Sequence, residues 1–449
     1  MSASIKLPAQ ATAVIAQLEE LGYEAYAVGG CVRDSLLGVG PDDWDITTSA
    51  MPEQVMEAFS GATVIPTGLQ HGTVTLLLEG TPFEVTTFRV DGSYSDSRRP
   101  DSVTFTRSIQ EDLARRDFTI NAMAYHPERG FVDPFGGRND LNAGIVRCVG
   151  EPERRFTEDA LRLLRCVRFA STLDFAIDSA TREAMLRLLP KLDSVARERV
   201  RTELGKALLG AGFERVFREN PAVLIQIIPE QEALIGFDQR TPYHIYDIWE
   251  HTLHAVQAAE RQPIIRLTML LHDIGKPQRF TVDVNGVGHF KGHATVSAEM
   301  SDRILRRLRY SNEIVERVTK LISYHHLELP PTAKAVKRWL GKLGVEAFRQ
   351  LMDVRRADAS AKNPVFGKKQ LEEIAVLEKV ADEVIRNGEC FSVSQLAIGG
   401  KELIAAGMKP GREIGELLSQ LTEAVIEEEV PNEQEALLTM ADELRRYPT

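Results

Sequence analysis

The chain has 449 residues, 43% of them hydrophobic and 27% charged, with a formal net charge of −11 at pH 7. That length is too great for one hydrophobic core and predicts about three domains or one multi-lobed helical protein. The acidity argues against a protein that coats nucleic acid non-specifically, because such binding needs clustered Lys and Arg. No apolar run approaches the ~20 residues of a membrane span, so we expect a cytoplasmic protein without membrane contact. Four scattered cysteines indicate neither a disulfide framework nor a thiolate zinc site.

Up to about residue 145 the chain alternates short β-like runs with helical patterns, which predicts an α/β domain. The runs are YEAYAVGG, GTVTLLL, PFEVTTFRV and GFVDPF. Beyond about residue 150 the apolar residues recur at helical spacing, except at residues 279–290, where Asn285 and Gly286 favour a hairpin. The fold class that we expect is α+β, an N-terminal α/β head followed by a mostly α-helical remainder.

Two short motifs in the head have the chemistry of a phosphate site and a metal site. Gly29 and Gly30 end a strand and begin a helix, where backbone N–H groups can approach a triphosphate, and Arg33 adds a cation. Asp43 and Asp45 lie two residues apart, which in a strand places both carboxylates on one face. Such a pair suits two Mg²⁺ ions in phosphoryl transfer.

Glu84, in PFEVTTF, is the best candidate for a third catalytic carboxylate. Alone, a D-x-D or a Gly-Gly pair is more often a plain turn, so the order of the motifs is the signal. GGCVRDSLLG, DDWDITT, LQHGTV, FEVTTFR, RRDFTINAMAY, DPFGGRNDL and TEDALRLLRCVRFA, in that order, resemble the class II tRNA nucleotidyltransferases of the polymerase-β superfamily, the CCA-adding enzymes. The resemblance is dense over the first 205 or so residues and looser beyond them.

The resemblance implies a polymerase-β-like head that binds Mg²⁺ through Asp43 and Asp45. In RRDFTINAMAY, Arg116 would touch the nucleotide, with Asp117 and Asn121 near the ribose. The full set of expected nucleotide-binding residues is Gly29, Gly30, Arg33, Arg116, Asp117, Asn121, Asp159, Arg162, Arg165 and Arg168.

The segment EDALR is expected to decide which nucleotide is used. On one helix, Asp159 and Arg162 would share a face, and Arg165 would continue it. An acid beside a base can match the edges of cytosine and adenine, and in the family this helix selects CTP and ATP. The alternative is an intrahelical salt bridge.

Residues 91–105, rich in Gly, Ser, Asp and Pro, predict a mobile loop, which the resemblance assigns to the switch from CTP to ATP. Its full length favours complete CCA addition.

Eight of the ten histidines fall between residues 244 and 326, which predicts a second, metal-dependent site. The H…HD…H…H…D order resembles the HD phosphohydrolase superfamily, and His and Asp ligands suit a divalent metal that activates water. His325 and His326 are alternatives for one ligand. An HD domain in this position resembles that of bacterial multifunctional CCA proteins and implies a phosphatase or 2′,3′-cyclic phosphodiesterase. The expected ligands are His251, His272, Asp273, His293, His325 and Asp358.

We therefore expect four parts: a nucleotidyltransferase head at 1–145, a helical neck at 146–235, an HD-type domain at 236–365 and a tRNA-binding helical tail at 366–449. The predicted activity is the addition of CCA to the 3′ end of tRNA from CTP and ATP, with release of pyrophosphate. Addition of only CC or only A remains an alternative, as does a bacterial poly(A) polymerase, which would carry a basic extension. From other classes, the chain would be a phosphohydrolase with an RNA-binding N-terminal half, or a non-catalytic RNA-binding scaffold.

Overall fold

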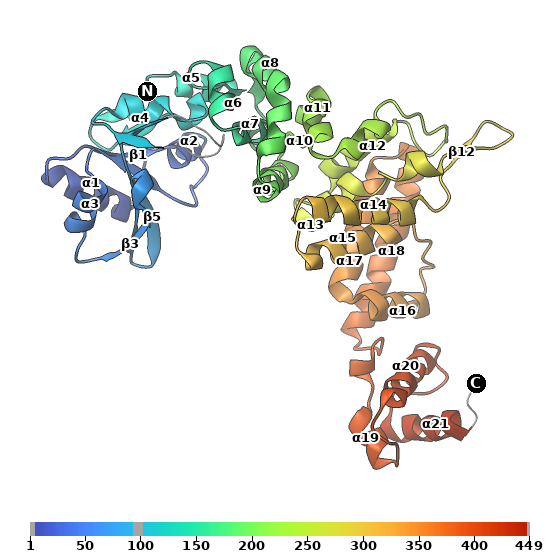
Figure 1. Ribbon diagram of the computed structural model, residues 1–449. Helices are drawn as coiled ribbons and strands as arrows, with labels where there is room; N and C mark the ends of the chain where they lie inside the picture. The colour runs from blue at the N-terminus through green and yellow to red at the C-terminus, as the bar shows by residue number, and fades with distance from the viewer. Residues whose placement is uncertain (1–4, 93–101, 447–449) are drawn as a thin grey trace. The chain divides into compact units, whose positions relative to one another are not determined.

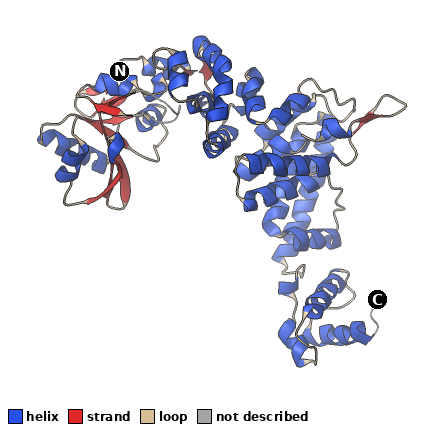
Figure 2. Ribbon diagram, viewed as in Figure 1, coloured by secondary structure: helices blue, strands red, loops and turns tan. Residues whose placement is uncertain are grey.

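The computed structural model describes residues 5–92 and 102–446, which form two compact units, Met1–Pro229 and Glu230–Thr449. The first unit holds nearly all of the strands, and the second is helical except for one hairpin (Figure 2). This arrangement confirms the predicted α+β class and the α/β head. The finer boundaries at residues 145, 235 and 365 stay predictions.

A seven-stranded sheet forms the centre of the head, with the strand order β3-β4-β5-β2-β1-β8-β9 (Figure 1). The β2 and β5 strands are parallel, and the other neighbouring pairs are antiparallel. The parallel pair sets Asp45 beside Glu84 in register. The strands are β1 (Ala25–Val28), β2 (Asp45–Thr48), β3 (Thr63–Gly68), β4 (Thr73–Leu78), β5 (Thr81–Thr87), β8 (Ala124–His126) and β9 (Gly130–Val132).

Helices of the head cover this sheet with an apolar stripe. In α1 the residues Val14 and Leu18, one turn apart, are fully buried and join Ile46 of β2 and Val85 of β5 in one core. A separate small ribbon pairs β6 (Arg89–Asp91) with β7 (Val103–Phe105). The helices of the head are α1 (Ala9–Glu20), α2 (Gly30–Leu36), α3 (Pro52–Ala58) and α4 (Ile109–Ala114).

The remainder of the first unit is helical, with one short parallel strand pair. In this part α7 packs against α9. The elements are α5 (Gly137–Ala143), β10 (Ile145–Val146), α6 (Pro152–Glu158), α7 (Leu161–Leu173), β11 (Ala176–Ile177), α8 (Ser179–Leu188), α9 (Arg197–Leu208), α10 (Phe213–Glu219) and α11 (Pro221–Ile227).

The second unit is a helical bundle with a hairpin at the predicted place. The strands β12 (Thr281–Val282) and β13 (Gly288–His289) pair antiparallel, and Gly286 in their turn has a φ of 80°. The bundle helices are α12 (Ile248–Ala258), α13 (Pro263–Leu271), α14 (His293–Arg307), α15 (Asn312–Tyr324), α16 (Ala333–Leu343), α17 (Val345–Ser360) and α18 (Pro364–Arg386).

The last three helices have a hydrophobic core of their own, to which Leu403, Leu421 and Leu437 contribute fully buried side chains. These helices are α19 (Gly400–Ala405), α20 (Arg412–Ile426) and α21 (Gln434–Arg446). Gly407, with a φ of 93°, makes the turn before α20, and the binding of tRNA by this helical tail stays a prediction. No helix in the described part of the chain is long and apolar enough to cross a membrane.

Candidate functional site

The Gly29–Gly30 turn joins the end of β1 to the start of α2 and lies against an arginine. Gly29 has a φ of 82°, a conformation that favours glycine. A Cβ atom at Gly29 would also lie only 2.7 Å from Nη1 of Arg116. The guanidinium of the RRDF motif therefore contacts the turn directly, and a side chain at Gly29 would displace it.

The three predicted catalytic carboxylates gather beside this turn. Asp45 begins β2, its register partner on β5 is Glu84, and Asp43 lies two residues before Asp45. Burial raises the pKa of Asp45 to about 6, with Asp43 and Glu84 adding to the increase and Arg116 opposing it. Neighbouring carboxylates repel one another and would be stabilised by a shared cation, and all-oxygen ligands fit Mg²⁺. Within the described residues these three do not converge as tightly as the ligand groups of the second unit.

A line of hydrogen bonds joins the residues expected to hold phosphate, ribose and base. Nη1 of Arg33 donates to Oδ1 of Asn121 at 2.6 Å, and Nδ2 of Asn121 donates to Oδ1 of Asp117 at 3.1 Å. Nε of Arg165 then donates to Oδ2 of Asp117 at 2.7 Å. Although burial opposes ionisation, the Arg165 guanidinium and the Asn121 amide hold the pKa of Asp117 far below its usual range. The structure thus brings four predicted residues into one network.

The ring of Phe169, which is 3% exposed, supports three of the predicted arginines. Its centroid lies 3.6 Å from Cζ of Arg168, 5.0 Å from Cζ of Arg33 and 5.4 Å from Cζ of Arg165. Guanidinium groups pack favourably on aromatic faces, so the ring keeps these cations together despite their mutual repulsion. Sequence reasoning did not single out Phe169, because an aromatic residue at helical spacing indicates only a core position.

The expected helical pairing of Asp159 with Arg162 is wrong. Asp159 is extended, with φ −137° and ψ 106°, and lies between α6 and α7 rather than on α7. Its Oδ1 accepts a hydrogen bond from the Leu161 N–H at 3.0 Å, which caps the first turn of α7. Arg162 instead donates to Oε2 of Glu158 at 2.8 Å. The capping tendency of aspartate prevailed over the continuous helical pattern of EDALR.

Two side chains from α9 hold Asp159 and Arg168, and the sequence prediction did not include them. Nη2 of Arg199 donates to Oδ2 of Asp159 at 3.1 Å. Oε2 of Glu203 accepts from Nε of Arg168 at 2.8 Å. Both lie in the stretch ARERVRTEL. The signal there was the family resemblance of the whole stretch, whereas no local spacing could reveal partners about 35 and 40 residues away.

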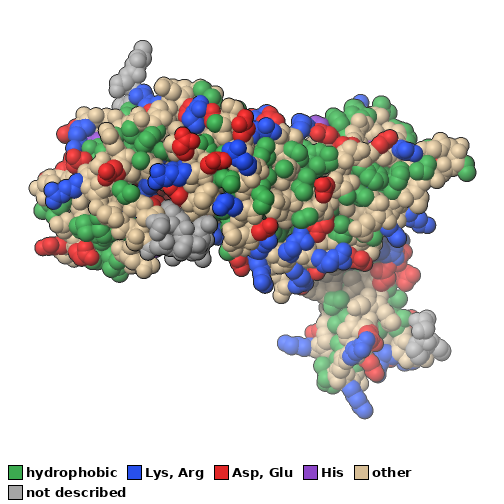
Figure 3. All heavy atoms as spheres, turned by 45° about the horizontal axis from the view of Figure 1, so that its top comes forward, with side chains coloured by type: hydrophobic (Ala, Val, Ile, Leu, Met, Phe, Trp, Pro, Cys, Tyr) green, Lys and Arg blue, Asp and Glu red, His purple; other side chains and the backbone are tan. Residues whose placement is uncertain are grey.

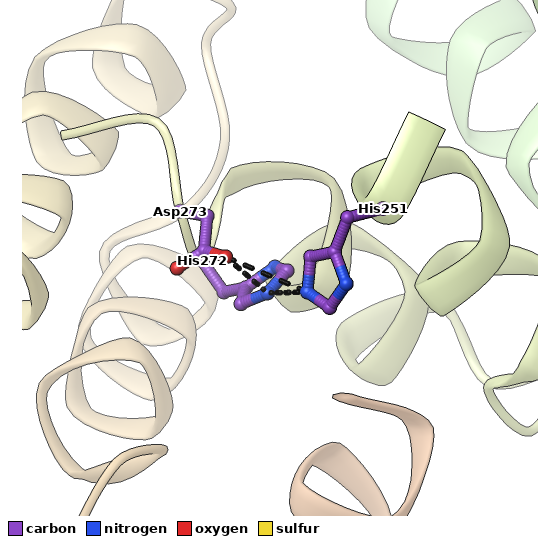
Figure 4. Close-up of side chains that lie close together, drawn as sticks. All are labelled: His251, His272 and Asp273. Atoms are coloured by element: carbon purple, nitrogen blue, oxygen red, sulfur yellow. Dashed lines mark hydrogen bonds and ion pairs between the residues drawn. The ribbon is translucent and has the colours of Figure 1, made fainter. Parts of the chain in front are cut away.

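The second candidate site lies in the second unit, where several helices bring the predicted ligands together. Figure 4 shows three of these ligands, His251, His272 and Asp273. His251 lies within α12 and Asp358 within α17. The other histidines occupy helix termini, His272 after α13, His293 at the start of α14 and His325 after α15. All of these side chains are buried, as is that of Asp273.

Backbone carbonyls fix which nitrogen of each histidine faces the centre. Nδ1 of His272, His293 and His325 each contacts the carbonyl oxygen three residues earlier, at 2.7, 2.8 and 2.6 Å. Nδ1 of His251 contacts the Ala361 carbonyl at 3.2 Å. A carbonyl oxygen can only accept, so each Nδ1 carries a proton, and in the neutral ring each Nε2 presents a lone pair. Four such lone pairs directed at one another suit a cation.

The two carboxylate oxygens of Asp273 lie near two different pairs of these nitrogens. Oδ2 lies 3.1 Å from Nε2 of His272 and 3.5 Å from Nε2 of His251, while Oδ1 lies 3.4 Å from Nε2 of His293 and 3.8 Å from that of His325. Apart from the ion pair between Oδ2 and Nζ of Lys276 at 2.7 Å, neither oxygen has a hydrogen-bond donor within the described residues. In each group all ligand atoms lie within 4.8 Å of one another. The donor set therefore fits a metal ion on either side of Asp273.

Asp358 lies beside the first group, with Oδ1 at 3.1 Å from Nε2 of His251. Burial lowers the pKa of His293 to about 3, which keeps its imidazole neutral and able to bind a metal. His326 lies beside His293, with ring centroids 5.4 Å apart, but does not belong to either ligand group. Of the two alternatives, His325 is the residue that the structure brings into the centre.

A cavity of about 810 Å³ opens onto this centre and carries basic and aromatic side chains. Lys276 and Lys362 are buried there and contact Asp273 and Asp358 at 2.7 and 2.6 Å. The other basic and aromatic residues of its wall include Lys291, Lys369, Tyr243, Phe290 and Phe366. Such a lining suits a ligand with both a phosphate and a flat ring.

Two other expectations concern larger surfaces. The predicted switching loop, 91–105, falls largely on residues 93–101, outside the described residues. On the face drawn in Figure 3 basic and acidic side chains are interspersed rather than gathered into one basic surface. That mixture matches the net charge and does not suggest non-specific coating of nucleic acid on this face.

Models of three protein families match the chain. A Poly A polymerase head domain matches residues 25–147, a probable RNA and SrmB-binding site of polymerase A matches residues 174–220, and a putative domain 2 of tRNA nucleotidyltransferase matches residues 291–441.

Relatives match over nearly the whole length. A CCA-adding enzyme of Limosilactobacillus reuteri is 35% identical over 435 residues, or 96% of each chain, and one of Lactiplantibacillus plantarum is 34% identical over 446 residues, or 97% of each. The crystal structure of the Bacillus stearothermophilus CCA-adding enzyme in complex with CTP is similar, with 32% identity, a TM-score of 0.75 and 98% of each chain covered. The CCA-adding enzyme of Thermotoga maritima, at 20% identity, a TM-score of 0.57 and coverage of 97% of this chain and 94% of that one, supports the fold alone.

Proposed function

This chain belongs to the family of CCA-adding enzymes, and from that premise we propose that it adds C, C and A in turn to the 3′ end of tRNA from CTP and ATP. The observation that carries the proposal is the hydrogen-bonded line from Arg33 through Asn121 and Asp117 to Arg165. It joins the glycine turn beside the carboxylates to α7, which follows the base-selecting segment. One continuous network thereby offers groups for phosphate, ribose and base.

At the catalytic end, Asp43 and Asp45 would hold Mg²⁺, which when bound neutralises charge on the attacking and leaving oxygens. Arg33 and Arg116 bind the triphosphate and keep it against the Gly29–Gly30 turn. With the phosphates held there, the 3′ hydroxyl of the tRNA attacks the α-phosphate in line and pyrophosphate leaves. Glu84, beside Asp45 in register, adds the third carboxylate.

At the selective end, Asp159 and Arg162 would read the base edge. A carboxylate can only accept hydrogen bonds and a guanidinium can only donate them. Cytosine and adenine both present an amino donor beside a ring-nitrogen acceptor, which complements this pair, whereas uracil and guanine present a carbonyl where Asp159 needs a donor. Arg162 donates to Glu158 and to two backbone carbonyls, so it exchanges one of these bonds for the base.

The test is incorporation of labelled CTP and ATP into tRNA that lacks CCA, with Mg²⁺ present. We expect both nucleotides to be added and Asp43→Ala to abolish the addition. Incorporation of CTP alone would indicate a CC-adding enzyme, and of ATP only onto tRNA ending in CC an A-adding enzyme. Long ATP runs on arbitrary RNA would indicate a poly(A) polymerase. No incorporation at all would overturn the transferase proposal.

We propose in addition that the second unit carries an HD-type phosphohydrolase. The observation that supports it is the convergence of the Nε2 atoms of four histidines on the carboxylate of Asp273, with the carboxylate of Asp358 beside His251. The ligands would be His251, His272, Asp273, His293, His325 and Asp358. Mixed imidazole and carboxylate ligands favour a transition metal over Mg²⁺.

The metal, when bound, would lower the pKa of a water molecule enough to make it a nucleophile. Lys276 and Lys362, beside the ligand carboxylates, bind and orient the phosphoryl oxygens of the substrate. Tyr243 and Phe366, whose rings meet edge to face at 4.7 Å, line the same cavity and offer a surface for a base. These groups suit a nucleotide phosphoester such as a 2′,3′-cyclic phosphate.

Release of product from a 2′,3′-cyclic nucleotide tests this second activity. We expect hydrolysis that depends on added transition metal and is lost in Asp273→Asn. His289→Ala is the matched control, because His289 lies in the same cavity but is exposed and outside the ligand groups. Hydrolysis without nucleotide transfer would favour a phosphohydrolase with an RNA-binding N-terminal half, and loss of neither activity in Asp273→Asn would overturn the proposal.

A further inference from the structure

Asp112 is a buried, charged residue of the head that none of the motifs above includes. It lies in α4, its side chain is 0% exposed, and it precedes the RRDF motif by a few residues. A fully buried carboxylate is costly unless several donors hold it. The number and origin of its donors therefore indicate what it does.

Four groups from three segments surround the Asp112 carboxylate. Oδ1 accepts from Nε of Arg115 at 2.9 Å and from the backbone N–H of Arg89 at 3.3 Å. Oδ2 accepts from the Thr47 hydroxyl at 3.2 Å and lies 3.8 Å from Nη2 of Arg116. Although burial opposes ionisation, the arginines hold the pKa of Asp112 below its ordinary value. The carboxylate is thus charged and shared between β2, the start of β6 and the RRDF segment.

On one side, Asp112 fixes the strand that carries the catalytic acids. Thr47 is two residues after Asp45 on β2, so the side chains of the two residues point to the same face of the sheet. Thr47 itself is fully buried. Its hydroxyl also contacts the Thr86 carbonyl of β5 at 3.2 Å, which joins the strand of Glu84 to the same point.

On the other side, Asp112 holds Arg116 in place. The Arg116 guanidinium lies against Gly29 and interacts electrostatically with Asp45, and its Nε makes no hydrogen bond within the described residues. An arginine with so few partners and a carboxylate nearby at Asp45 would rotate toward the catalytic acids if nothing opposed it. The negative charge of Asp112, whose Oδ2 lies 3.8 Å from Nη2 of Arg116, supplies that opposition.

We propose that Asp112 is a positioning residue for nucleotidyl transfer, which holds Arg116 at the triphosphate and away from the catalytic carboxylates. This inference rests on the proposed function, in which Arg116 binds the nucleotide. Asp112 touches no reactant and acts through Arg116. It sets the apparent affinity for CTP and ATP rather than the stability of the head alone.

A double-mutant cycle separates this role from a structural one, because residues that act through each other give non-additive effects. We expect Asp112→Asn to raise the KM for CTP and for ATP about tenfold, with a smaller change in kcat. On an Arg116→Gln background the same substitution should change kcat/KM less than about twofold. A structural role would give the same fold loss on both backgrounds, and that result would overturn the proposal.

The matched control is Asp178→Asn. The Asp178 carboxylate also binds an arginine, Arg147, and caps a helix, α8. The effect of this substitution on kcat/KM should be equal on the wild-type and Arg116→Gln backgrounds. If Asp112→Asn does not fold, Asp112→Glu, whose extra methylene group displaces the carboxylate from Arg116, enters the same cycle with the same two criteria. A wild-type protein without any nucleotide incorporation would instead contradict the proposed function, and an unaffected Arg116→Gln would contradict the role of Arg116.

Discussion

The two candidate sites hold their functional side chains in opposite ways. In the head, the functional residues are held by other side chains from distant elements, as Arg199 holds Asp159 and Arg165 holds Asp117. In the second unit, backbone carbonyls fix each histidine, three of them from the residue three positions earlier. Side-chain contacts can be exchanged for a substrate, whereas carbonyl contacts leave the lone pairs permanently aimed at one point. This difference supports the proposals that the head binds an exchanging ligand and that the second site binds a resident cation.

The largest expected effect tests whether the two sites are independent. We expect Asp43→Asn to lower nucleotide incorporation on the order of a thousandfold and to leave hydrolysis unchanged, because metal-bound charge supplies several kcal/mol. Asp273→Asn should do the reverse and also lower the transition-metal content measured by mass spectrometry after gel filtration. Loss of both activities in either variant, with the protein still folded by circular dichroism, would contradict the separation.

The second prediction is that the same type of substitution, Asp to Asn, changes the free energy of unfolding in opposite directions at the two sites. The pKa of Asp45 is raised from 3.8 to about 6, so its contribution to stability is fully present below pH 3.8 and is lost as pH rises through 6. In metal-free protein at pH 7.5, Asp45→Asn should therefore stabilise the fold by up to roughly 3 kcal/mol, and by almost nothing at pH 4. The measurement is calorimetric unfolding in chelator at both pH values.

Asp273 gives the contrasting result in the same experiment. Although burial opposes ionisation, His272 and Lys276 hold the pKa of Asp273 well below 3.8. Its contribution is then present above the unfolded pKa and is lost as pH falls through the folded pKa. Asp273→Asn should destabilise the metal-free protein at pH 7.5. The same sign of change at both aspartates would show that the two sites do not differ in the way proposed here.

In both sites, some of the candidate residues could be proposed from the sequence because they are neighbours in the chain. Gly29, Asp43 and Asp45 lie close together in the chain, and the HD pair is adjacent, so residue type and spacing made them candidates and the order of the motifs selected them. The α+β fold class followed in the same way from the change of hydrophobic period near residue 150.

The supporting residues could not be found in this way, because their partners are far apart in sequence. The Asp112 carboxylate meets Thr47 across 65 residues, and Arg199 meets Asp159 across 40. The helical register of EDALR misled for a different reason, since Asp159 satisfies the Leu161 N–H and interrupts the helix there. A long-range partner and a local cap are both properties of the folded chain.

The smallest expected effect concerns selectivity rather than rate. Arg199 holds Asp159 in one orientation as an acceptor, so Arg199→Gln should let the carboxylate rotate and raise incorporation of UTP relative to CTP by about tenfold, the scale of one lost hydrogen bond to a charged group. Arg197→Gln is the matched control, because Arg197 lies on the same helix and pairs with Asp193 instead. The measurement is competitive incorporation of labelled UTP and CTP into tRNA lacking CCA. Equal selectivity in the two variants would mean that Asp159 orients itself through the Leu161 N–H alone, and the head would then resemble the second site in relying on backbone contacts.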